Sequence, residues 1–484
     1  MTPVSPPTFL AQSTLGRIGP QVLRPRYDRA AVEVGIVHFG PGAFHRAHQA
    51  WFVDELLAQD PRWGICAVSL RNKEVQEALA PQDGLYTLAT LDETLSYRVI
   101  GALREILVAP QNPAATLERL AAPTTRVVTI TVTEKGYCLD PDGKLDLTHP
   151  DIQHDMRHPR TPASLIGYLV EGLRRRKLAG AGPLAIISCD NLVDNGTRLR
   201  GAVSQLACQY DVGLGRWIEE NQYFPRTMVD SITPATTPAL KERLEGVLGL
   251  TDRWPVQRES FAQWVLEDRI APGGPDWASV GITLTDDVAA YDRAKLRLLN
   301  GAHSTLAYLG LLAGHVTVAD AMKDDELRAF VVNLMREDIL PTLRAPGGLD
   351  LYSYVDTILR RFRNPAINHL LAQIAWDGSQ KLPFRLLGTL LDSLEAGRPI
   401  ERLCVPIAAW MHFVRRRALE GVRVTDPLAD RLFDIGRASE GRADRDLGPF
   451  LTLDPVFPPA LARAPIFTQA LARAYDELAP RAQL

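Results

Sequence analysis

The stretch "VGIVHFGPGAFHRAHQAW" (residues 34–51) decides the fold of the first half of the chain. It reads as a short apolar strand, a turn with two glycines and a helix. Gly40 and Gly42 form a G-x-G turn, in which Gly40 makes the tight bend and Gly42 allows backbone to approach a pyrophosphate. The first amides of the following helix, at Ala43 and Phe44, are then expected to face that phosphate.

A two-glycine turn is weak evidence by itself, because His45 replaces the third glycine of the dinucleotide fingerprint. The turn could simply join a strand to a helix. Its surroundings favour the dinucleotide interpretation, since short apolar strands alternate with helical patterns up to about residue 285. Such strands predict a parallel sheet covered on both faces. The clearest strands are expected at 34–40, 63–70, 126–133 and 184–189, and helices at 46–58, 163–176 and 198–209.

The second part of the chain has a different pattern. From about residue 286 the strand signal nearly vanishes, and helical stretches are expected at 287–313, 316–341, 351–375, 383–396, 400–420 and 459–478. A chain of 484 residues also exceeds the size at which one core stops growing. We therefore predict an α/β, Rossmann-like, doubly wound N-terminal domain (1–285, with a Pro-rich extension) and an all-α C-terminal domain (286–484).

Composition narrows the class of protein. Hydrophobic residues make up 46% and charged residues 23%, as in soluble globular proteins, and a net charge of −3 offers no basic field to nucleic acid. No apolar run is long enough to span a membrane, and the first residues lack the pattern of a secretory signal. The five cysteines are scattered and form no CxxC pair, which suggests reduced thiols. We expect a cytoplasmic monomer or small homo-oligomer that binds neither nucleic acid nor membrane.

The end of the second strand bears on the cofactor. An acidic residue there accepts the ribose 2′-hydroxyl of NAD, whereas an arginine accommodates the 2′-phosphate of NADP. The sequence "SLRNKE" (69–74) places Arg71 and Lys73 at this point, and Glu74 is the nearest acid. NAD is the expected cofactor, and NADP stays open. A solvated turn without a cofactor role would have the same composition.

The stretch "KLRLLNGAHSTLAYLG" (295–310) reads as a buried helix that carries three unexpected polar residues. Burying any of them without a partner costs several kcal/mol. At about 100° per residue, Asp292, His303 and Asn300 lie about 60°, 80° and 140° from Lys295. The polar groups therefore share one face, and much of the opposite face is leucine.

This polar face has the residues that a proton-transfer centre needs. A lysine can act as a general base when desolvation lowers its pKa. Asparagine and histidine can donate hydrogen bonds to an oxygen that gains negative charge. Lys295, Asn300 and His303 thus suit the oxidation of a secondary alcohol by hydride transfer without a metal. A polar stripe on a half-exposed helix is the structural alternative.

Two other motifs in the sequence have alternative interpretations. Tyr291 and Lys295 form a Y-x-x-x-K pair, with Ser279 upstream, as in short-chain dehydrogenases. In those enzymes the pair lies within the single Rossmann domain, whereas here it begins the helical part. His45 and His48 are spaced for one helix face, but no third or fourth ligand follows at a suitable spacing. We therefore predict no metal site.

Seven motifs in order resemble the mannitol dehydrogenase family of polyol-specific long-chain dehydrogenases. They cover nearly the whole chain: residues 35–50, 131–138 ("TVTEKGYC"), 188–196 ("SCDNLVDNG"), 224–236 ("FPRTMVDSITPAT"), 261–268 ("FAQWVLED"), 295–304 ("KLRLLNGAHS"), and 364–367 with 377–383 ("NPAI…DGSQKLP"). The resemblance implies a Rossmann domain followed by a helical domain, an NAD(P) cofactor and a small sugar-derived substrate.

The resemblance also implies roles for individual residues. Lys295 would be the catalytic acid/base, with Asn300 and His303 polarising the reacting oxygen. Asp292 stands where the family carries an acidic residue associated with proton exchange. Since aspartate is the shorter carboxylate, that role stays open.

Further positions follow from the same resemblance. Asn191 and Asp230 match positions near the nicotinamide and the substrate, and Lys381 matches a substrate-binding lysine. Gln373 departs from mannitol 2-dehydrogenases, which typically carry an arginine nine residues after the Asn of "NPAI". "EKGYC" and "QIAWDGSQKLP" instead resemble the fructuronate reductase (mannonate oxidoreductase) branch. A hexuronate needs a cation for its carboxylate. The candidates are Lys135, Arg361, Arg363, Lys381 and Arg385.

We therefore expect a metal-independent NAD(P)-dependent oxidoreductase. It would interconvert D-mannonate and D-fructuronate, and a neutral pair such as D-mannitol and D-fructose is the open alternative. A non-catalytic sugar or nucleotide sensor with the same fold would be expected to have lost the proton-transfer lysine, and Lys295 is present.

Overall fold

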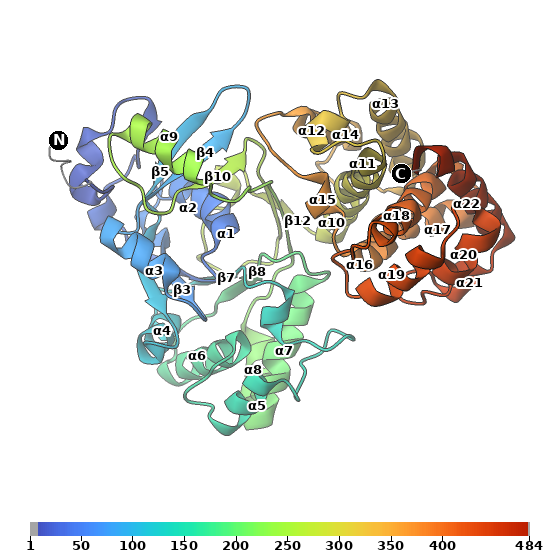
Figure 1. Cartoon of the computed structure of the whole chain (residues 1–484). Helices are drawn as coiled ribbons and strands as arrows, with labels where there is room; N and C mark the ends of the chain where they lie inside the picture. The colour runs from blue at the N-terminus through green and yellow to red at the C-terminus, as the bar shows by residue number, and fades with distance from the viewer. Residues whose placement is uncertain (1–7, 483–484) are drawn as a thin grey trace. The chain divides into compact units, whose positions relative to one another are not determined.

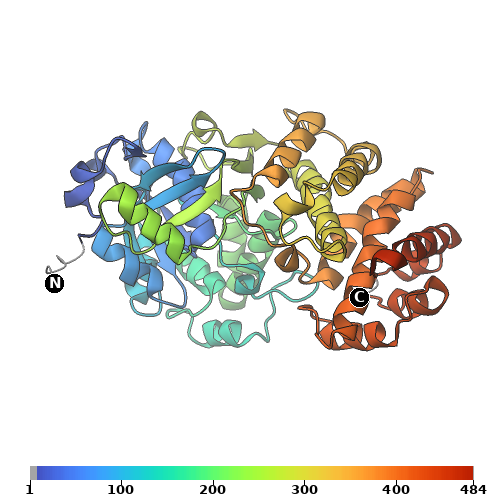
Figure 2. The ribbon, with the colours of Figure 1, turned by 45° about the horizontal axis from the view of Figure 1, so that its top comes forward.

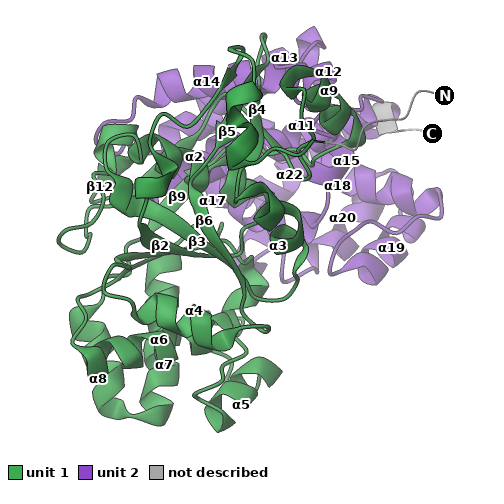
Figure 3. Cartoon of the chain, turned by 90° about the vertical axis from the view of Figure 1, so that its left-hand side faces the viewer, with its two compact units in different colours: residues 1–288 green, residues 289–484 purple. Residues whose placement is uncertain are grey.

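The computed structural model describes residues 8–482 and divides into two compact units. Unit 1 runs to Val288 and unit 2 begins at Ala289, and Figure 3 draws them in different colours. Figure 1 labels helices and strands of the whole chain. No helix in the described part of the chain has both the length and the apolar composition that crossing a membrane requires.

A five-stranded parallel sheet forms the centre of unit 1. Its strand order is β6-β3-β2-β7-β8, and every neighbouring pair is parallel. The strands are β2 (Val34–Phe39), β3 (Gly64–Ser69), β6 (Leu103–Val108), β7 (Val127–Ile130) and β8 (Ala185–Ser188). All residues of β2 and β3 are buried, which explains why their sequences show no alternation.

Helices cover both faces of this sheet, as predicted for a doubly wound domain. One apolar core joins the sheet to α4, α6, α7 and α8, and a second joins it to α2 and α3 (Figure 3). The helices of unit 1 are α1 (Ala43–Ala47), α2 (Gln49–Leu56), α3 (Glu74–Leu79), α4 (Pro113–Ala121), α5 (Pro150–Arg157), α6 (Leu165–Ala179), α7 (Asn195–Tyr210), α8 (Val212–Asn221) and α9 (Pro238–Leu248).

The helix expected over residues 46–58 is in fact two helices. His48 has φ −118° and ψ −84°, outside the helical region, and it separates α1 from α2. Periodicity alone did not reveal this break, because apolar residues continue on both sides of it.

Two smaller sheets were not anticipated. One has the order β1-β5-β4-β10 and the other β12-β11-β9, and each contains an antiparallel pair. Their strands are β1 (Val22–Leu23), β4 (Tyr86–Leu91), β5 (Ser96–Ile100), β9 (Thr227–Asp230), β10 (Val256–Glu259), β11 (Gln263–Glu267) and β12 (Thr283–Thr285). Short strands that pair with distant segments leave little periodic signal in the sequence.

Unit 2 is helical, and its described residues contain no strand (Figure 2). Its long helix α18 packs against α11, α19 and α22. The helices from α10 onward are α10 (Val288–Ala294), α11 (Gly301–Leu312), α12 (Val318–Ala321), α13 (Asp325–Asn333), α14 (Leu351–Arg363), α15 (Leu371–Ile374), α16 (Gly378–Leu382), α17 (Gly388–Glu395), α18 (Glu401–Leu419), α19 (Ala429–Ala438), α20 (Ala443–Leu451), α21 (Pro459–Ala462) and α22 (Pro465–Leu478).

Several long helices expected in unit 2 are interrupted. The stretch 351–375 contains α14, a loop with Pro365 and then α15, since a proline cannot continue a helix from the residue before it. π-Helical segments occupy Lys295–Asn300, Leu334–Ile339 and Pro383–Leu387. Such segments are rare and occur frequently at functional sites.

Candidate active site

The turn between β2 and α1 has the geometry of a phosphate cradle. Gly40 has φ +88°, and a Cβ there would lie 2.1 Å from the backbone oxygen of Thr131, so only glycine fits. Gly42 is the N-cap of α1, and a Cβ at this position would have only the Gly40 oxygen, at 3.9 Å, within reach. The space beside the Cα atom of Gly42 is therefore open.

The backbone amides that follow this turn are available to a ligand. Gly42 offers no capping side chain, and the N–H groups of Ala43 and Phe44 donate to no acceptor within residues 8–482. Backbone donors of this kind bind anions at helix N-termini. The turn thus fits the pyrophosphate of a dinucleotide, and Gly40, Gly42, Ala43 and Phe44 lie together there.

His45, which replaces the third glycine, is fully buried. Its ring stacks on that of His38, with 3.3 Å between centroids and 9° between planes. Neither ring nitrogen of His45 has a hydrogen-bond partner in the described structure. Burial, and then the charge of His38, holds the pKa of His45 well below its usual range, so the ring is neutral. Its surroundings are those of a packing residue.

The turn after β7 is held by one buried carboxylate. Asp190 accepts hydrogen bonds from the amides of Val132 and Thr133, both at 3.0 Å, and from the hydroxyl of Tyr137 at 2.8 Å. These bonds hold Thr133 at φ +67°, a strained conformation for a β-branched residue. Lys135 follows within this turn and is exposed.

Several predicted residues of unit 1 lie at the carboxyl edge of the main sheet. Arg71 follows β3, Lys135 follows β7 and Asn191 follows β8, and all three are exposed. The carboxyl ends of parallel strands meet at one edge, where ligands of open α/β sheets bind. Asp230 is the last residue of β9, opposite Gln263 of β11, and is 5% exposed.

In unit 2, Lys295 and Asn300 are the first and last residues of a π-helical segment. A π-helix bonds residue i to residue i+5, so it brings positions five apart onto one face. In a regular α-helix these two residues would lie about 140° apart. The wider turn therefore corrects the angular estimate made from the sequence and improves the alignment of Lys295 with Asn300. Lys295 is 9% exposed, and its side chain is largely removed from water.

Gly301 explains why this turn can pack so closely. A Cβ on Gly301 would lie 2.9 Å from the backbone oxygen of Arg385, which belongs to a second π-helical segment. The two unusual segments therefore touch backbone to backbone, directly beside Asn300. A larger residue at position 301 would push them apart.

His303, on the next turn, is buried in an aromatic and cationic environment. Its ring lies 4.4 Å from that of Phe362 and meets His369 edge-on at 5.0 Å. Burial, followed by the charges of His369, Arg361 and Arg385, lowers the pKa of His303 well below its usual range. Its Nε2 atom is buried without a hydrogen-bond partner in the described structure. A buried polar atom without a partner is uncommon and is available to a ligand oxygen.

Three cations gather around His303 and the adjacent His369. We call Arg361, Lys381 and Arg385 the cationic cluster. Arg385 donates to Ser304 Oγ at 3.1 Å, and Lys381 donates to the backbone oxygen of Ile374 at 3.4 Å. Burial lowers the pKa of Lys381, and the nearby Arg385 lowers it further, although Asp377 and Asp426 oppose the shift. Concentrated positive charge of this kind attracts an anion.

Comparison with known proteins identifies the family to which this chain belongs. The model of the mannitol dehydrogenase Rossmann domain matches residues 34–279, and that of the mannitol dehydrogenase C-terminal domain matches residues 287–479. The chain belongs to the mannitol dehydrogenase family. As a member of this family it is an oxidoreductase that acts on CH–OH groups.

Relatives within the mannitol dehydrogenase family match over most of their length. D-mannonate oxidoreductase of Escherichia coli (strain K12) is 41% identical, over 95% of this chain and 96% of that protein. Polyol:NADP oxidoreductase of Gluconobacter oxydans (strain 621H) is 39% identical, over 85% and 87%. Mannitol 2-dehydrogenase of Pseudomonas fluorescens, solved as a ternary complex with NAD and D-mannitol, is 36% identical with a TM-score of 0.83, over 97% and 96%.

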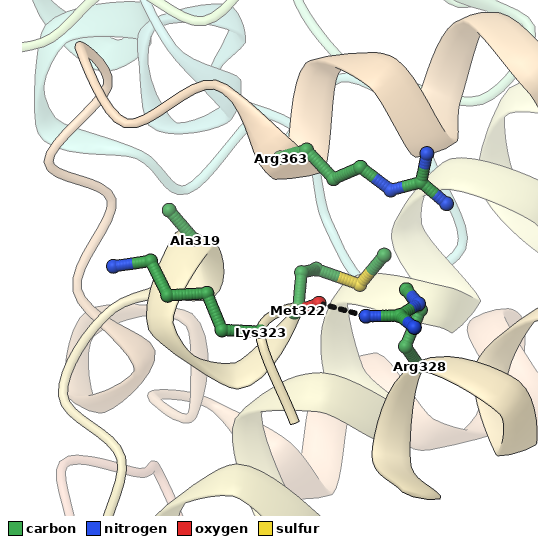
Figure 4. Close-up of a pocket in the computed structure, with 5 residues that line it drawn as sticks. All are labelled: Ala319, Met322, Lys323, Arg328 and Arg363. Carbon is green, nitrogen blue, oxygen red and sulfur yellow. Dashed lines mark hydrogen bonds between the residues drawn. The ribbon is translucent and has the colours of Figure 1, made fainter. Parts of the chain in front are cut away.

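Within this mannitol dehydrogenase family member, two further predicted residues have different surroundings. Gln373, on α15, is exposed. Arg363 lines a pocket of about 560 Å³ with Ala319, Met322, Lys323 and Arg328 (Figure 4). In that pocket Arg328 donates to the backbone oxygen of Met322 at 3.3 Å. Arg363 was a candidate to bind the substrate carboxylate. It lines a pocket to which no residue of the cationic cluster contributes.

The tyrosine of the Y-x-x-x-K motif has a structural partner. The Tyr291 hydroxyl donates to the backbone oxygen of Gly347 at 3.0 Å, and its side chain is buried. This bond ties α10 to the loop before α14. Asp292, half-buried on the same helix, lies about one turn before Lys295.

One group of potential metal ligands exists in the described residues. Cys138, His149 and Asp151 have ligand atoms within 4.8 Å of one another. However, His149 Nδ1 already accepts the amide hydrogen of Asp151, and burial together with Asp151 raises the pKa of the Cys138 thiol to about 11. His45 and His48 do not belong to this group.

His369 was missed by the sequence analysis. It lies in the loop between α14 and α15, and its Nδ1 is buried without a hydrogen-bond partner in the described part of the chain. Its position three residues after Ala366 of "NPAI" was the available signal, but only the tertiary structure brings it to His303.

Proposed function

We propose that this enzyme interconverts a hexonate and a 2-keto-hexuronate, with D-mannonate and D-fructuronate as the best candidates. The observation that carries this proposal is the cationic cluster around His303. A carboxylate can form charge-assisted hydrogen bonds with Lys381 or Arg385 in this cluster, whereas a neutral polyol can form only uncharged ones. The name of the E. coli relative, D-mannonate oxidoreductase, supports the same substrate class.

The cofactor proposed is NAD, with NADP also open. The Pseudomonas relative binds NAD, and the Gluconobacter relative is named for NADP. The turn at Gly40 and Gly42, with the free amides of Ala43 and Phe44, would hold the pyrophosphate. Asn191 and Asp230 are proposed near the nicotinamide end. When bound, the nicotinamide supplies or accepts the hydride.

The chain's own residues then handle the proton and the oxygen. In reduction, Asn300 donates a hydrogen bond to the carbonyl oxygen at C2, and His303 Nε2–H donates a second. Both bonds strengthen as that oxygen becomes an alkoxide. Lys295, as the ammonium, transfers a proton to the alkoxide, and in oxidation neutral Lys295 removes it.

The substrate carboxylate is assigned to cations of the chain. Lys381 and Arg361 are proposed to bind it from unit 2, and Lys135 is a further candidate from the turn after β7. Gln373, a neutral residue in place of arginine, is proposed to line the same binding site. We propose a small-molecule substrate and a cytoplasmic location, and the five free cysteines agree with that location. The proposed assembly is a monomer or a small homo-oligomer.

A neutral polyol is the second candidate. It is favoured by the D-mannitol bound to the Pseudomonas relative, which is 36% identical over 97% of this chain. A substrate panel separates the two. The oxidation or appearance of reduced nicotinamide would be followed with D-fructuronate, D-tagaturonate, D-fructose, D-mannonate and D-mannitol. We expect kcat/KM for D-fructuronate to exceed that for D-fructose by at least about tenfold. A preference for D-fructose or D-mannitol would contradict the uronate proposal.

A further inference from the structure

Lys381 lies in the first turn of a helix, where the backbone needs support from other segments. Helix α16 begins at Gly378 within the motif "DGSQKLP" (377–383), only three residues before Lys381. The first amides of a helix have no partner within that helix. The N-cap residue, Asp377, has φ +54° and provides no side-chain hydrogen bond. The start of α16 therefore depends on contacts with other parts of unit 2.

Asp426, in the loop between α18 and α19, provides this support. Its carboxylate accepts hydrogen bonds from the amide of Ser379 at 2.8 Å and from the Ser379 hydroxyl at 2.5 Å. The backbone oxygen of the preceding residue, Thr425, accepts the amide hydrogen of Asp377 at 2.8 Å. Three hydrogen bonds thus join the start of α16 to a loop that is distant in the sequence.

The loop that carries Asp426 is itself well fixed. The Asp426 carboxylate also accepts the amide hydrogen of Leu428 at 2.9 Å, and its backbone oxygen accepts that of Ala429, the first residue of α19, at 3.0 Å. Burial lowers the pKa of Lys381, and the negative charge of Asp426 opposes that shift. Asp426 therefore combines a rigid contact to α16 with a charge that favours the ammonium form of Lys381.

The opposite side of the α16 start is packed against the helices of unit 2. A Cβ atom on Gly378 would lie 2.5 Å from Trp410 Nε1 and 2.7 Å from the Tyr308 hydroxyl, and both of these side chains are buried. The Lys381 ammonium itself makes only a long hydrogen bond, 3.4 Å, to the backbone oxygen of Ile374. The position of its backbone therefore largely decides where this ammonium lies.

We propose that Asp426 is a positioning residue for substrate binding, which holds the first turn of α16 through Ser379 so that Lys381 meets the substrate carboxylate. The inference deepens the proposed function and rests on it for the role of Lys381. Asp426 itself contacts neither the substrate nor the cofactor. A displaced ammonium forms a weaker charge-assisted hydrogen bond, because such a bond depends on distance and angle. Loss of Asp426 should therefore raise KM for a charged substrate and leave kcat nearly unchanged.

A double-mutant cycle on the full chain tests this role. Asp426→Ala should raise KM for D-fructuronate by about 5- to 10-fold, and change kcat and the affinity for NADH by less than about twofold. In a chain that already carries Lys381→Met, the same change should raise KM by less than about twofold, because no ammonium remains to be positioned. Asp426→Asn keeps one oxygen that accepts a hydrogen bond, so its effect should be intermediate, and it replaces the alanine variant in the cycle if that variant does not fold.

Asp324→Ala is the matched control. Asp324 caps α13, in the same unit, by accepting the amide hydrogens of Glu326 at 3.0 Å and Leu327 at 3.1 Å. Its loss should destabilise the unit in a similar way but change KM for D-fructuronate by less than about twofold. The proposal is overturned if Asp426→Ala leaves KM unchanged, if its effect is the same with and without Lys381, or if Asp324→Ala raises KM equally.

A measurement without substrate separates this inference from the proposed function. Acetylation of individual lysines, followed by mass spectrometry, reports how accessible each ammonium group is. Asp426→Ala should speed the acetylation of half-buried Lys381 by at least about threefold and leave that of exposed Lys323 unchanged. If Lys381→Met does not affect D-fructuronate, the proposed role of Lys381 fails, while the acetylation rates still decide whether Asp426 holds this lysine. Equal rates in the wild type and Asp426→Ala would overturn the inference.

Discussion

The ring of His303 meets the ring of His369 edge-on, with 5.0 Å between their centroids. His303 comes from α11 and His369 from the loop before α15, so a buried and a half-buried residue that are far apart in the sequence meet here. Both have a lowered pKa, caused first by burial. The lowered pKa values favour neutral imidazoles, which can act as hydrogen-bond partners, and Lys295 is the proposed group for proton transfer.

Lys295→Ala should reduce turnover by about 10²- to 10⁴-fold, because a general acid–base group is lost. The affinity for the nicotinamide cofactor should stay near that of the wild type, and a small added amine should restore part of the activity. Steady-state kinetics and cofactor titration measure the two effects. Near-normal turnover at saturating substrate would show that Lys295 is not the acid/base.

Tyr291→Phe is the companion variant. It removes the hydrogen bond to the Gly347 carbonyl, so it should lower the free energy of unfolding by about 1 kcal/mol and leave turnover nearly unchanged. A loss of turnover as large as that of Lys295→Ala would instead support the short-chain dehydrogenase mechanism.

Lys381→Met tests the charge of the substrate. If Lys381 holds a carboxylate, kcat/KM for D-fructuronate should fall by about 10- to 100-fold, and that for D-fructose by several-fold less. Arg363→Gln is the control, since Arg363 lines a separate pocket, and it should affect both substrates little. Equal losses on charged and neutral substrates would make Lys381 a structural residue.

Lys135→Met tests whether the turn after β7 contributes a cation that binds the substrate carboxylate. This lysine is exposed, so its replacement should not unfold the chain. A selective loss of about tenfold for D-fructuronate would assign it to the carboxylate. Unchanged kinetics for both substrate types would remove Lys135 from the site.

Unit 1 should lose stability in mild acid because of its stacked histidines. Burial lowers the pKa of His38 to about 3, and that of His45 also lies far below its usual range. Above about pH 6.5 neither state binds a proton there. Below that pH only the unfolded state binds a proton at these histidines. Each histidine therefore lowers the free energy of unfolding by about 1.4 kcal/mol per pH unit, until the pH reaches the pKa of that histidine in the folded state.

Urea unfolding between pH 7.5 and 4.5 measures this slope. His45→Phe keeps a stacked ring and removes one titrating group, so its slope should be shallower by up to about 1.4 kcal/mol per pH unit. His158→Gln, at an exposed position, should leave the slope unchanged. Identical slopes for His45→Phe and the wild type would mean that His45 is protonated in the folded state.

Prolonged chelation should leave activity intact, because in the proposed mechanism Lys295, Asn300 and His303 supply the proton and the hydrogen bonds that the reaction requires. The assay is turnover after dialysis against a chelator. Loss of activity that zinc alone restores would contradict this mechanism, and Cys138→Ser would then test the one group of potential ligands in the described residues.

The sequence by itself determined the features that local patterns encode. Apolar strands alternating with helices predicted the doubly wound sheet, and Gly40 was recognisable because a tight turn after a strand needs a positive φ. Lys295, Asn300 and His303 stood out because polar residues in a leucine-rich helix are costly without a role.

Only the tertiary structure decided how these residues meet. The π-helical turn that brings Lys295 and Asn300 towards one face lies beside a close approach of Gly301 to the backbone oxygen of Arg385, and these two residues are distant in the sequence. The cationic cluster likewise joins α14 to the segment around Lys381, and Arg363, only two residues from Arg361, faces a different pocket. Periodicity reports which face of a helix is buried, whereas packing against distant segments decides what each buried group touches.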